Sequence, residues 1–303
     1  MAKKAYVPKK FRQESIQLIQ KINAIIGEYA VQGYSLTLRQ VYYQLVARDI
    51  IANNERSYKN LGNLVSDGRL AGEIDWYAIE DRTRNLRGRT HWENPAEIIS
   101  ASAYSYHRDY WEGQENYVEV WVEKDALVGI VGKACSELDV NFFSCRGYVS
   151  QSEMWSAAER LKRKQKIGGK NIVLLHLGDH DPSGKDMSRD IVERLKVFGV
   201  SEVEFHRLAL NYEQIEKYNP PPNPTKLSDS RARGYIQEYG YSCWELDALE
   251  PQIISRLIEQ NVKKYRDETM YNLVRRREER EMRQLRTMAD NWDEFKRKIE
   301  ELL

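Results

Sequence analysis

The chain has 303 residues, a length that suggests about two domains. Its 47 basic and 46 acidic residues leave a net charge of +1, so binding to nucleic acid cannot be argued from the total and needs local basic patches. Three scattered cysteines fit neither a disulfide framework nor a zinc site, and no apolar run approaches transmembrane length. We therefore expect reduced thiols in a cytoplasmic protein that does not associate with membranes.

The N-terminal third of the chain is predicted to be mostly helical. Between Phe11 and Ala30 apolar residues recur at helical spacing, and Gly33 ends the predicted helix. Thr37 and Gln40 form the capping-box pattern that opens a second helix. The apolar face of this second helix consists of residues spaced three and four apart: Leu38, Val41, Tyr42, Leu45 and Val46.

Tyr43 lies about 100° round the second helix from Tyr42, so we predict that Tyr42 is buried and Tyr43 is presented at the surface. Arg39 stands four residues before Tyr43, a spacing at which helical side chains touch. A neighbouring guanidinium favours the phenolate form of tyrosine, whose ordinary pKa is about 10, and can also hold a phosphate oxygen. From spacing alone, an ordinary exposed tyrosine is the favoured interpretation.

A third helix is predicted from its candidate cap, Ser57, to about Leu70, with Leu61, Leu64 and Val65 facing inward. A helix at this point of a helix-turn-helix would enter the major groove of DNA. The basic run that follows contains four arginines: Arg82, Arg84, Arg87 and Arg89. We favour a wing that touches DNA phosphates, and a solvated charged loop is the alternative.

From Tyr117 onward, strand patterns alternate with helix patterns. Strands are predicted near 117–122, 140–145, 172–177 and 202–208, and helices near 125–138, 151–167 and 184–198. This alternation predicts an α/β fold with a mostly parallel sheet and right-handed crossovers.

Three carboxylates follow two of these strands. Glu123 ends the first strand, while Asp179 and Asp181 follow the third at a spacing that points both side chains to one face. Ligand sites of parallel sheets lie beyond the carboxyl ends of the strands, and Mg²⁺ prefers oxygen ligands. The sequence therefore predicts a magnesium site, and the alternative is that Asp181 or Ser183 only caps the next helix. His180 points to the opposite face and is left out of this site.

Beyond Pro251 the chain is charged and predicted to form a long helix or a pair of helices. Apolar residues spaced three and four apart form a heptad seam: Leu285, Met288, Trp292, Phe295, Ile299 and Leu302. Pairing of this seam with a partner chain and packing against the chain's own body are both open.

Several motifs resemble the Toprim domain, the magnesium-binding module of topoisomerases, primases and certain nucleases. They are Val-Glu-Lys-Asp-Ala-Leu at 122–127, Cys-Arg-Gly-Tyr at 145–148 and Gly-Asp-His-Asp-Pro-Ser-Gly at 178–184. Upstream, Arg-Gln-Val-Tyr-Tyr at 39–43 resembles the Arg-x-x-(Tyr or Phe)-Tyr motif of the topoisomerase VI A subunit and its relative, the meiotic double-strand-break transesterase. Trp-Glu-Leu-Asp-Ala-Leu at 244–249 is similar to a late segment of that subunit.

The resemblance implies a winged-helix domain over 1–100, a Toprim Rossmann-like domain over 115–250 and a C-terminal helical extension over 251–303. It implies that Tyr43 attacks a DNA phosphorus and becomes joined to the broken strand, while Arg39 stabilises the charge on the phosphate. Glu123, Asp179 and Asp181 would then hold Mg²⁺.

The same resemblance implies the partners. The enzyme would act on double-stranded DNA of the nucleoid as a homodimer, in which one subunit's tyrosine meets the other's metal site. A separate ATPase subunit of the B type is a further expected partner, and at this length the chain is similar to the short A-subunit homologues called Mini-A.

Two other interpretations are open. The first is a metal-dependent nuclease, in which water hydrolyses DNA at the same carboxylates and Tyr43 is only structural. The second is a non-catalytic DNA-binding or regulatory protein that kept the fold.

Overall fold

The computed structural model describes residues 3–79 and 91–301 of the chain. Contacts divide the chain into two compact units, one comprising Met1–Thr83 with Val118–Lys264 and the other Arg84–Tyr117 with Tyr265–Leu303. The division into 1–100, 115–250 and 251–303 stays a prediction. The four arginines of the predicted wing, at positions 82, 84, 87 and 89, lie outside the described residues.

The first unit begins with the helices α1 (Gln13–Val31), α2 (Leu38–Ala47) and α3 (Glu55–Leu70). The predicted capping box of α2 is present, because the backbone N–H of Thr37 donates to Gln40 Oε1 at 2.8 Å and Gln40 N–H donates to Thr37 Oγ1 at 3.3 Å. The predicted cap of α3 is wrong. Asn54 Oδ1 accepts the N–H of Ser57, so Ser57 lies inside the first turn. The apolar faces of the three helices share one core, which includes Ile22, Tyr29, Val41, Leu45, Leu61 and Val65.

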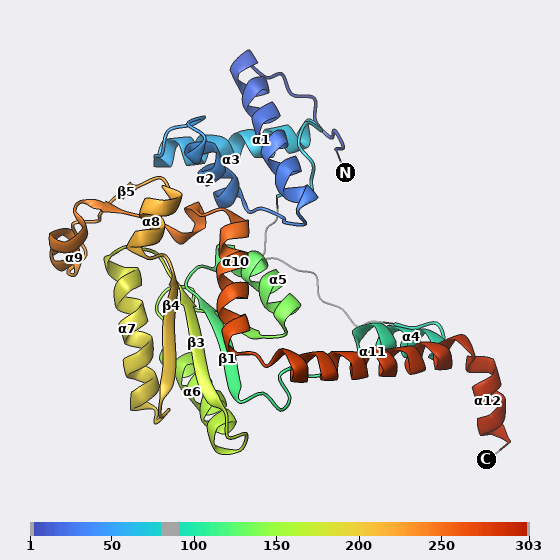
Figure 1. Cartoon of the computed structure of the whole chain (residues 1–303). Helices are drawn as coiled ribbons and strands as arrows, with labels where there is room; N and C mark the ends of the chain where they lie inside the picture. Colours follow the sequence, from blue (N-terminus) through green and yellow to red (C-terminus); the bar gives the residue numbers. More distant parts are fainter. Residues whose placement is uncertain (1–2, 80–90, 302–303) are drawn as a thin grey trace. The chain divides into compact units, whose positions relative to one another are not determined.

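A parallel four-stranded sheet follows, in the order β2-β1-β3-β4 (Figure 1). Its strands are β1 (Asn116–Val122), β2 (Asn141–Ser144), β3 (Asn171–Leu177) and β4 (Val203–Ala209), close to the predicted bounds. The central strands β1 and β3 are buried at every position after the first, as expected for a parallel sheet with both faces covered. The prediction of an α/β fold is confirmed.

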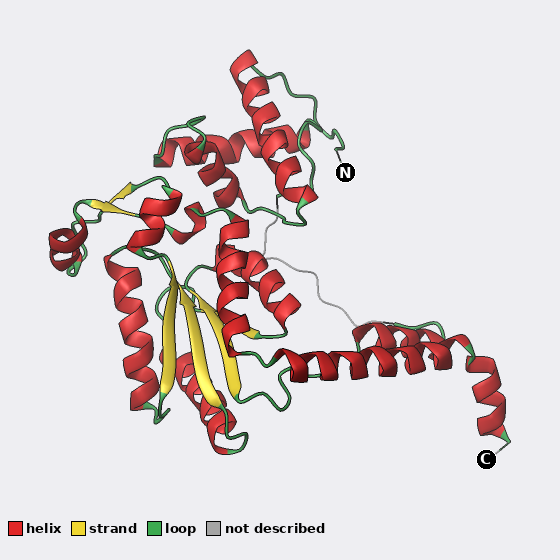
Figure 2. Cartoon of the chain, in the orientation of Figure 1, coloured by secondary structure: helices red, strands yellow, loops and turns green. Residues whose placement is uncertain are grey.

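Helices cover both faces of this sheet (Figure 2). The crossovers are the short η1 (Asp125–Leu127) with α5 (Val128–Leu138), then α6 (Gln151–Lys166) and α7 (Pro182–Val197). From β1 the chain crosses to β2, then passes back over β1 to β3 and continues to β4. With right-handed crossovers, α5 lies on one face of the sheet, and α6 and α7 lie on the other. α10 (Pro251–Val262) packs beside α5 (Figure 1). Because β2 and β3 lie on opposite sides of β1, the direction of the crossovers reverses between β1 and β3.

The segment between β4 and α10 returns to the carboxyl edge of the sheet. It contains α8 (Tyr212–Tyr218), β5 (Asn223–Pro224), α9 (Ala232–Tyr239), β6 (Ser242–Cys243) and η2 (Leu246–Ala248). β5 and β6 pair antiparallel. Immediately after β6, His180 and Trp244 exchange two backbone hydrogen bonds of 2.9 Å each. This bridge places η2 beside the residues that follow β3.

The second unit consists of α4 (Pro95–Ser105), α11 (Glu268–Asp290) and α12 (Trp292–Glu300), and η3 (Lys263–Tyr265) precedes α11. α4 and α11 lie side by side (Figure 1). Buried Glu278 of α11 joins this helix to the segment that follows α4. Its Oε2 accepts the N–H of Arg108 at 2.6 Å and contacts His107 Nδ1 at 2.9 Å. Because the helix breaks at Asn291, the predicted heptad seam does not run along one continuous helix, and its last residue, Leu302, lies outside the described residues.

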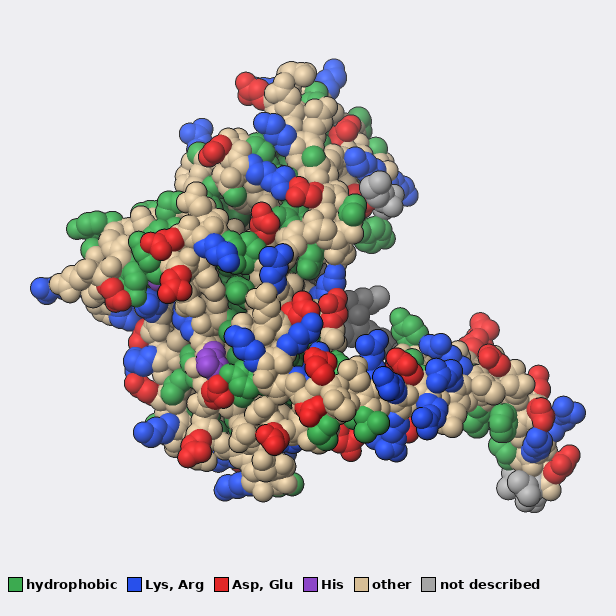
Figure 3. Space-filling model, in the orientation of Figure 1, with side chains coloured by type: hydrophobic (Ala, Val, Ile, Leu, Met, Phe, Trp, Pro, Cys, Tyr) green, Lys and Arg blue, Asp and Glu red, His purple; other side chains and the backbone are tan. Residues whose placement is uncertain are grey.

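The surface of α11 carries both signs of charge. Basic and acidic side chains are intermixed along it (Figure 3), and ion pairs join Arg275 to Glu279 at 3.5 Å and Arg277 to Glu281 at 2.9 Å. Such pairs stabilise an exposed helix by a few tenths of a kcal/mol each, about 0.3–0.5 for a good pair. Positive and negative charges are therefore mixed on this helix, as they are in the whole chain.

Two further properties predicted from the sequence concern the cysteines and the membrane. Cys135, Cys145 and Cys243 are free thiols, in line with the expectation, and all three are buried. Within 3–79 and 91–301, no helix combines the length and apolar character that crossing a membrane requires.

Candidate functional site

Glu123 and Asp179 lie at the switch point of the sheet, where ligand sites of open α/β sheets form. Glu123 directly follows β1, and the N–H of Asp179 donates to Glu123 Oε2 at 2.8 Å. Burial raises the pKa of both carboxyl groups, and the ammonium of Lys124 opposes that effect at each. The structure thus brings these two sequence-predicted residues together, although they are 56 positions apart.

Asp181 has a different neighbourhood. Its Oδ1 accepts the N–H of Gly184 at 2.6 Å and the hydroxyl of Ser183 at 2.9 Å, so Asp181 is the N-cap of α7. A side chain at position 184 would place its Cβ 2.3 Å from the carbonyl oxygen of Asp179 and 3.0 Å from Glu123 Oε2. Glycine at 184 therefore allows the first turn of α7 to approach both carboxylate-bearing segments.

Lys124 is the cation of this cluster, and sequence reasoning did not single it out. Its Nζ lies 3.0 Å from Asp179 Oδ2, 2.6 Å from Glu245 Oε2 and 3.0 Å from Asp247 Oδ1. Although burial acts to lower it, these three carboxylates raise the pKa of Lys124 above its ordinary value. The ammonium therefore stays charged inside the cluster.

Arg39 joins the same carboxylates from α2. Its Nε donates to Asp247 Oδ2 at 2.8 Å, and its Nη2 contacts Glu245 Oε2. The guanidinium also stands over the ring of Tyr43, 5.7 Å from the ring centroid, so the predicted neighbours are in contact. The helix that carries Tyr43 is thereby linked to the edge of the sheet that carries Glu123 and Asp179.

The predicted exposure of Tyr43 is wrong. Its side chain is 4 % exposed and belongs to the same core as Tyr42, because η2 covers the face of α2 that helical periodicity leaves open. Arg39 favours the phenolate, as predicted, but other influences outweigh it. Burial first, and then the charges of Glu245 and Asp247, raise the pKa of Tyr43 above its ordinary value, while Arg39 acts only to lower it. The hydroxyl is therefore protonated at neutral pH in this conformation.

Glu245 and Asp247 were missed as site residues, although the motif that contains them was noted. The bridge between His180 and Trp244 fixes their segment, and the N–H of Leu246 donates to Asp179 Oδ1 at 2.7 Å. His180 itself is buried, with its Nδ1 2.7 Å from the hydroxyl of Tyr235, which supports leaving it out of the ligand set.

Arg207, at the end of β4, braces the loop after β3, and no local sequence signal marks it. Its guanidinium donates to the carbonyl oxygens of Gly178 at 3.0 Å and Gly184 at 2.9 Å, to that of Asp179, and to Ser188 Oγ at 2.7 Å. One side chain therefore holds both ends of the loop that carries the two aspartates.

The donor set can be tested against the magnesium that the sequence predicts. Three carboxylates supply the hard oxygen ligands that Mg²⁺ prefers. Among the described residues, however, no group of three or more His, Cys, Asp or Glu side chains is arranged to hold a metal ion. Lys124 neutralises Asp179, and Asp181 caps α7, so the chemistry of the residues suits the ion while their present contacts are made to protein donors.

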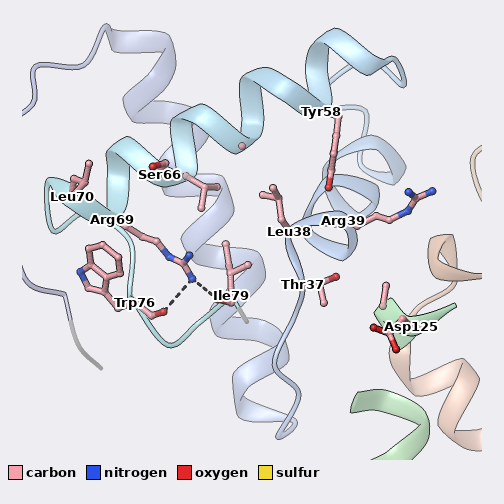
Figure 4. Close-up of a pocket in the computed structure, with 13 residues that line it drawn as sticks. Thr37, Leu38, Arg39, Tyr58, Ser66, Arg69, Leu70, Trp76, Ile79 and Asp125 are labelled. Atoms are coloured by element: carbon pink, nitrogen blue, oxygen red, sulfur yellow. Dashed lines mark hydrogen bonds between the residues drawn. The ribbon is translucent and has the colours of Figure 1, made fainter. Parts of the chain in front are cut away.

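A pocket of about 540 Å³ adjoins this cluster along α3 (Figure 4). One stripe of α3 lines it, together with the start of α2: Tyr58, Gly62, Val65, Ser66, Arg69, Thr37, Leu38 and Arg39. Arg69 closes one end by donating to the carbonyl oxygens of Trp76, at 3.1 Å, and Ile79. Arg39 lines this pocket and also contacts the carboxylates of Glu245 and Asp247.

His176, on β3, leads to a prediction about pH. The ring is fully buried and its Nδ1 lies 3.0 Å from Ser188 Oγ, but no described residue forms a hydrogen bond to Nε2. Burial first, and then the charge of Arg207, lower the pKa of His176 to about 3. The unfolded chain binds this proton near pH 6.5, so the free energy of unfolding should fall by up to about 1.4 kcal/mol per pH unit as the pH drops from about 6.5 toward 3.

Urea titrations at a series of pH values measure this slope. His176→Gln cannot be protonated and should flatten it. An identical slope in wild type and His176→Gln would assign the acid sensitivity to other groups.

Comparison with known proteins adds no identification. No protein-family model matches the chain, and neither a curated protein nor a solved structure matches it. The resemblance carried by the short motifs around Tyr43, Glu123 and Asp179 therefore stays a hypothesis, which has to be judged by chemistry and experiment.

Proposed function

We propose that the chain is a magnesium-dependent DNA transesterase of the topoisomerase VI A type, with a winged-helix region and a Toprim domain. One observation carries this proposal. Arg39, which lies beside the candidate nucleophile Tyr43, and Lys124, which follows the candidate ligand Glu123, share the carboxylates of Glu245 and Asp247. The helix of the candidate nucleophile and the carboxylate-rich edge of the sheet thus share one set of charged residues, and in the homodimer the tyrosine of one subunit would meet the metal site of the other.

In the proposed reaction the hydroxyl oxygen of Tyr43 attacks a backbone phosphorus. The hydroxyl of Tyr43 loses its proton as a Tyr–O–P bond forms, the bond from phosphorus to the leaving sugar oxygen breaks, and that sugar oxygen takes up a proton, so no net proton is gained or lost. Arg39 stabilises the negative charge that builds on the phosphate. Mg²⁺ held by Glu123, Asp179 and Asp181 would neutralise the phosphate and orient the strand. A homodimer, and a separate ATPase subunit for strand passage, belong to the same proposal.

One observation favours a second candidate, a metal-dependent nuclease. Tyr43 is buried, and its pKa is raised, whereas Glu123 and Asp179 lie at the switch point of the sheet. In that reaction water replaces Tyr43 as the attacking group, and both products are free DNA ends.

A single assay separates these functions. The protein is incubated with supercoiled plasmid and Mg²⁺, the reaction is stopped with detergent, and lanes with and without protease are compared. Breaks that are revealed only after protease treatment support the transesterase, because the protein is then joined to DNA. Breaks in both lanes support the nuclease, and retarded but intact plasmid before detergent supports binding alone.

The arginine run gives a prediction for the DNA-binding part of this proposal. Replacing Arg82, Arg84, Arg87 and Arg89 by Ala should weaken binding to any duplex sequence. Because arginines that neutralise phosphates release counterions, the slope of log K against log salt should become shallower by about 0.9 for each phosphate that the variant no longer neutralises. Fluorescence anisotropy with a labelled duplex at several salt concentrations measures both effects.

A charge-matched variant controls for the removal of positive charge. It replaces four arginines of α11: Arg275, Arg276, Arg277 and Arg280. This variant should keep the wild-type slope, since two of these residues pair with glutamates of the same helix. An unaltered slope in the first variant would show that the run does not touch DNA.

A further inference from the structure

Two cations from distant parts of the first unit converge on one oxygen atom. Arg39 Nη2, from α2, and Lys124 Nζ, after β1, both contact Oε2 of Glu245, the latter at 2.6 Å. A carboxylate oxygen held between a guanidinium and an ammonium has the surroundings that proteins give to a phosphate oxygen.

Asp247 contacts both cations and holds them in place. Its side chain is 0 % exposed, and it uses a different oxygen for each partner, Oδ2 for Arg39 Nε at 2.8 Å and Oδ1 for Lys124 Nζ at 3.0 Å. Asp179 holds Lys124 from a further side at 3.0 Å. The spacing of the two cations is therefore set without the help of Glu245.

Glu245 is the exchangeable member of the cluster. Its side chain is 24 % exposed, and its other oxygen accepts a long hydrogen bond of 3.4 Å from Asn223. A phosphodiester carries one negative charge, as the Glu245 carboxylate does, so replacing one by the other keeps the charge of the cluster constant. A buried pair that loses one partner is strongly destabilised, but an exchange of equal charges avoids this cost.

We propose that Arg39 and Lys124 form a binding site for one phosphate of the DNA backbone, and that the carboxylate of Glu245 occupies this site until DNA displaces it. The inference rests on the proposed function for the identity of the ligand. It adds Lys124 as a phosphate-binding residue and Glu245 as an internal competitor. Because Arg39 lies against the ring of Tyr43, a phosphate bound here is beside the candidate nucleophile.

The test measures binding of a labelled DNA duplex in EDTA, so that cleavage does not interfere. Glu245→Gln keeps the shape of the side chain but removes the competing charge, and it should bind DNA about tenfold more tightly, which corresponds to about 1.4 kcal/mol. Glu137→Gln removes one exposed carboxylate of α5 and controls for the general loss of negative charge. This control should gain far less affinity.

A double variant shows whether the gain acts through the proposed site. Lys124→Met should weaken binding on its own, and in the Lys124→Met background the change Glu245→Gln should no longer tighten it. Circular dichroism melting checks that each variant folds. If Glu245→Gln does not fold, Glu245→Asp keeps the charge but shortens the side chain, and it should give a smaller gain in the same direction.

The outcomes separate this inference from the proposed function. If Glu245→Gln gains no more than Glu137→Gln, or keeps its gain without Lys124, the phosphate site is refuted while DNA binding by the wild type still stands. If the wild type itself does not bind DNA, both the proposed function and this inference fail. A gain that requires Lys124 supports the site.

Discussion

Tyr43→Phe is expected to bind duplex DNA as the wild type does but to form no covalent protein–DNA adduct. The change removes only a hydroxyl, and the ring keeps its edge-to-face contact with Tyr42, at a centroid distance of 5.2 Å, within the N-terminal core. Without the oxygen nucleophile no phosphotyrosine ester can form, so adduct should fall to background. Retention of labelled DNA in a denaturing protein gel, with and without protease, measures it.

Tyr42→Phe is the matched control on the same helix. The hydroxyl of Tyr42 donates to Asn53 Oδ1 at 2.9 Å, so this variant should lose about 1 kcal/mol of stability but retain adduct formation. Full adduct formation by Tyr43→Phe would refute the proposed nucleophile. If Tyr43→Phe still cuts DNA without adduct, and the cutting requires Asp179, the nuclease becomes the favoured function.

The burial of Tyr43 adds a requirement to this reaction. A phenol that is 4 % exposed cannot reach a phosphorus atom, and the nearby carboxylates favour its protonated form. Displacement of Glu245 by a phosphate would keep the charge of the cluster constant but would release Arg39, which lies over the ring of Tyr43, from its contact with the Glu245 carboxylate. Binding of DNA and exposure of the nucleophile would then be one event, which fits the phosphate site inferred above.

The parts of the fold that depend on neighbouring residues were predictable. The apolar runs of β1 and β3 are buried on both faces, and the four strands lie close to their predicted positions because strand and helix periods differ clearly. The capping box of α2 was also predictable, because Thr37 and Gln40 form hydrogen bonds to each other within one turn. At the start of α3 the predicted cap, Ser57, was wrong, because Asn54, three residues earlier, accepts the N–H of Ser57.

The candidate site was only partly predictable. Glu123 and Asp179 could be placed together because parallel strands end at one edge of a sheet. The burial of Tyr43 could not, because helical periodicity describes one helix and contains no information on η2, whose Asp247 lies 208 residues beyond Arg39. The roles of Lys124, Glu245 and Arg207 could not be predicted from the sequence for the same reason. Their contacts are made across the chain, and their local sequence shows only ordinary charged residues.

Asp179→Asn and Asp181→Asn are each expected to abolish magnesium-dependent cleavage. Each change removes the negative charge that a bound cation needs but keeps a local structural role. Asparagine at 179 still offers an oxygen to the N–H of Leu246, which donates at 2.7 Å to Asp179 Oδ1, and asparagine at 181 is a good N-cap for α7. Alanine would lose these roles as well, so the asparagine variants isolate the charge.

Plasmid cleavage over a range of Mg²⁺ concentrations measures this effect, with melting temperature as the check on folding. Asp190→Asn is the matched control, since Asp190 lies on α7 and pairs with Arg194 at 3.2 Å away from the cluster. It should keep its cleavage activity. Asp179→Asn also frees Lys124 from one of its three carboxylates, so DNA binding without metal should be retained or strengthened while cleavage is abolished. Undiminished cleavage by both variants would refute the assignment of these carboxylates to the metal.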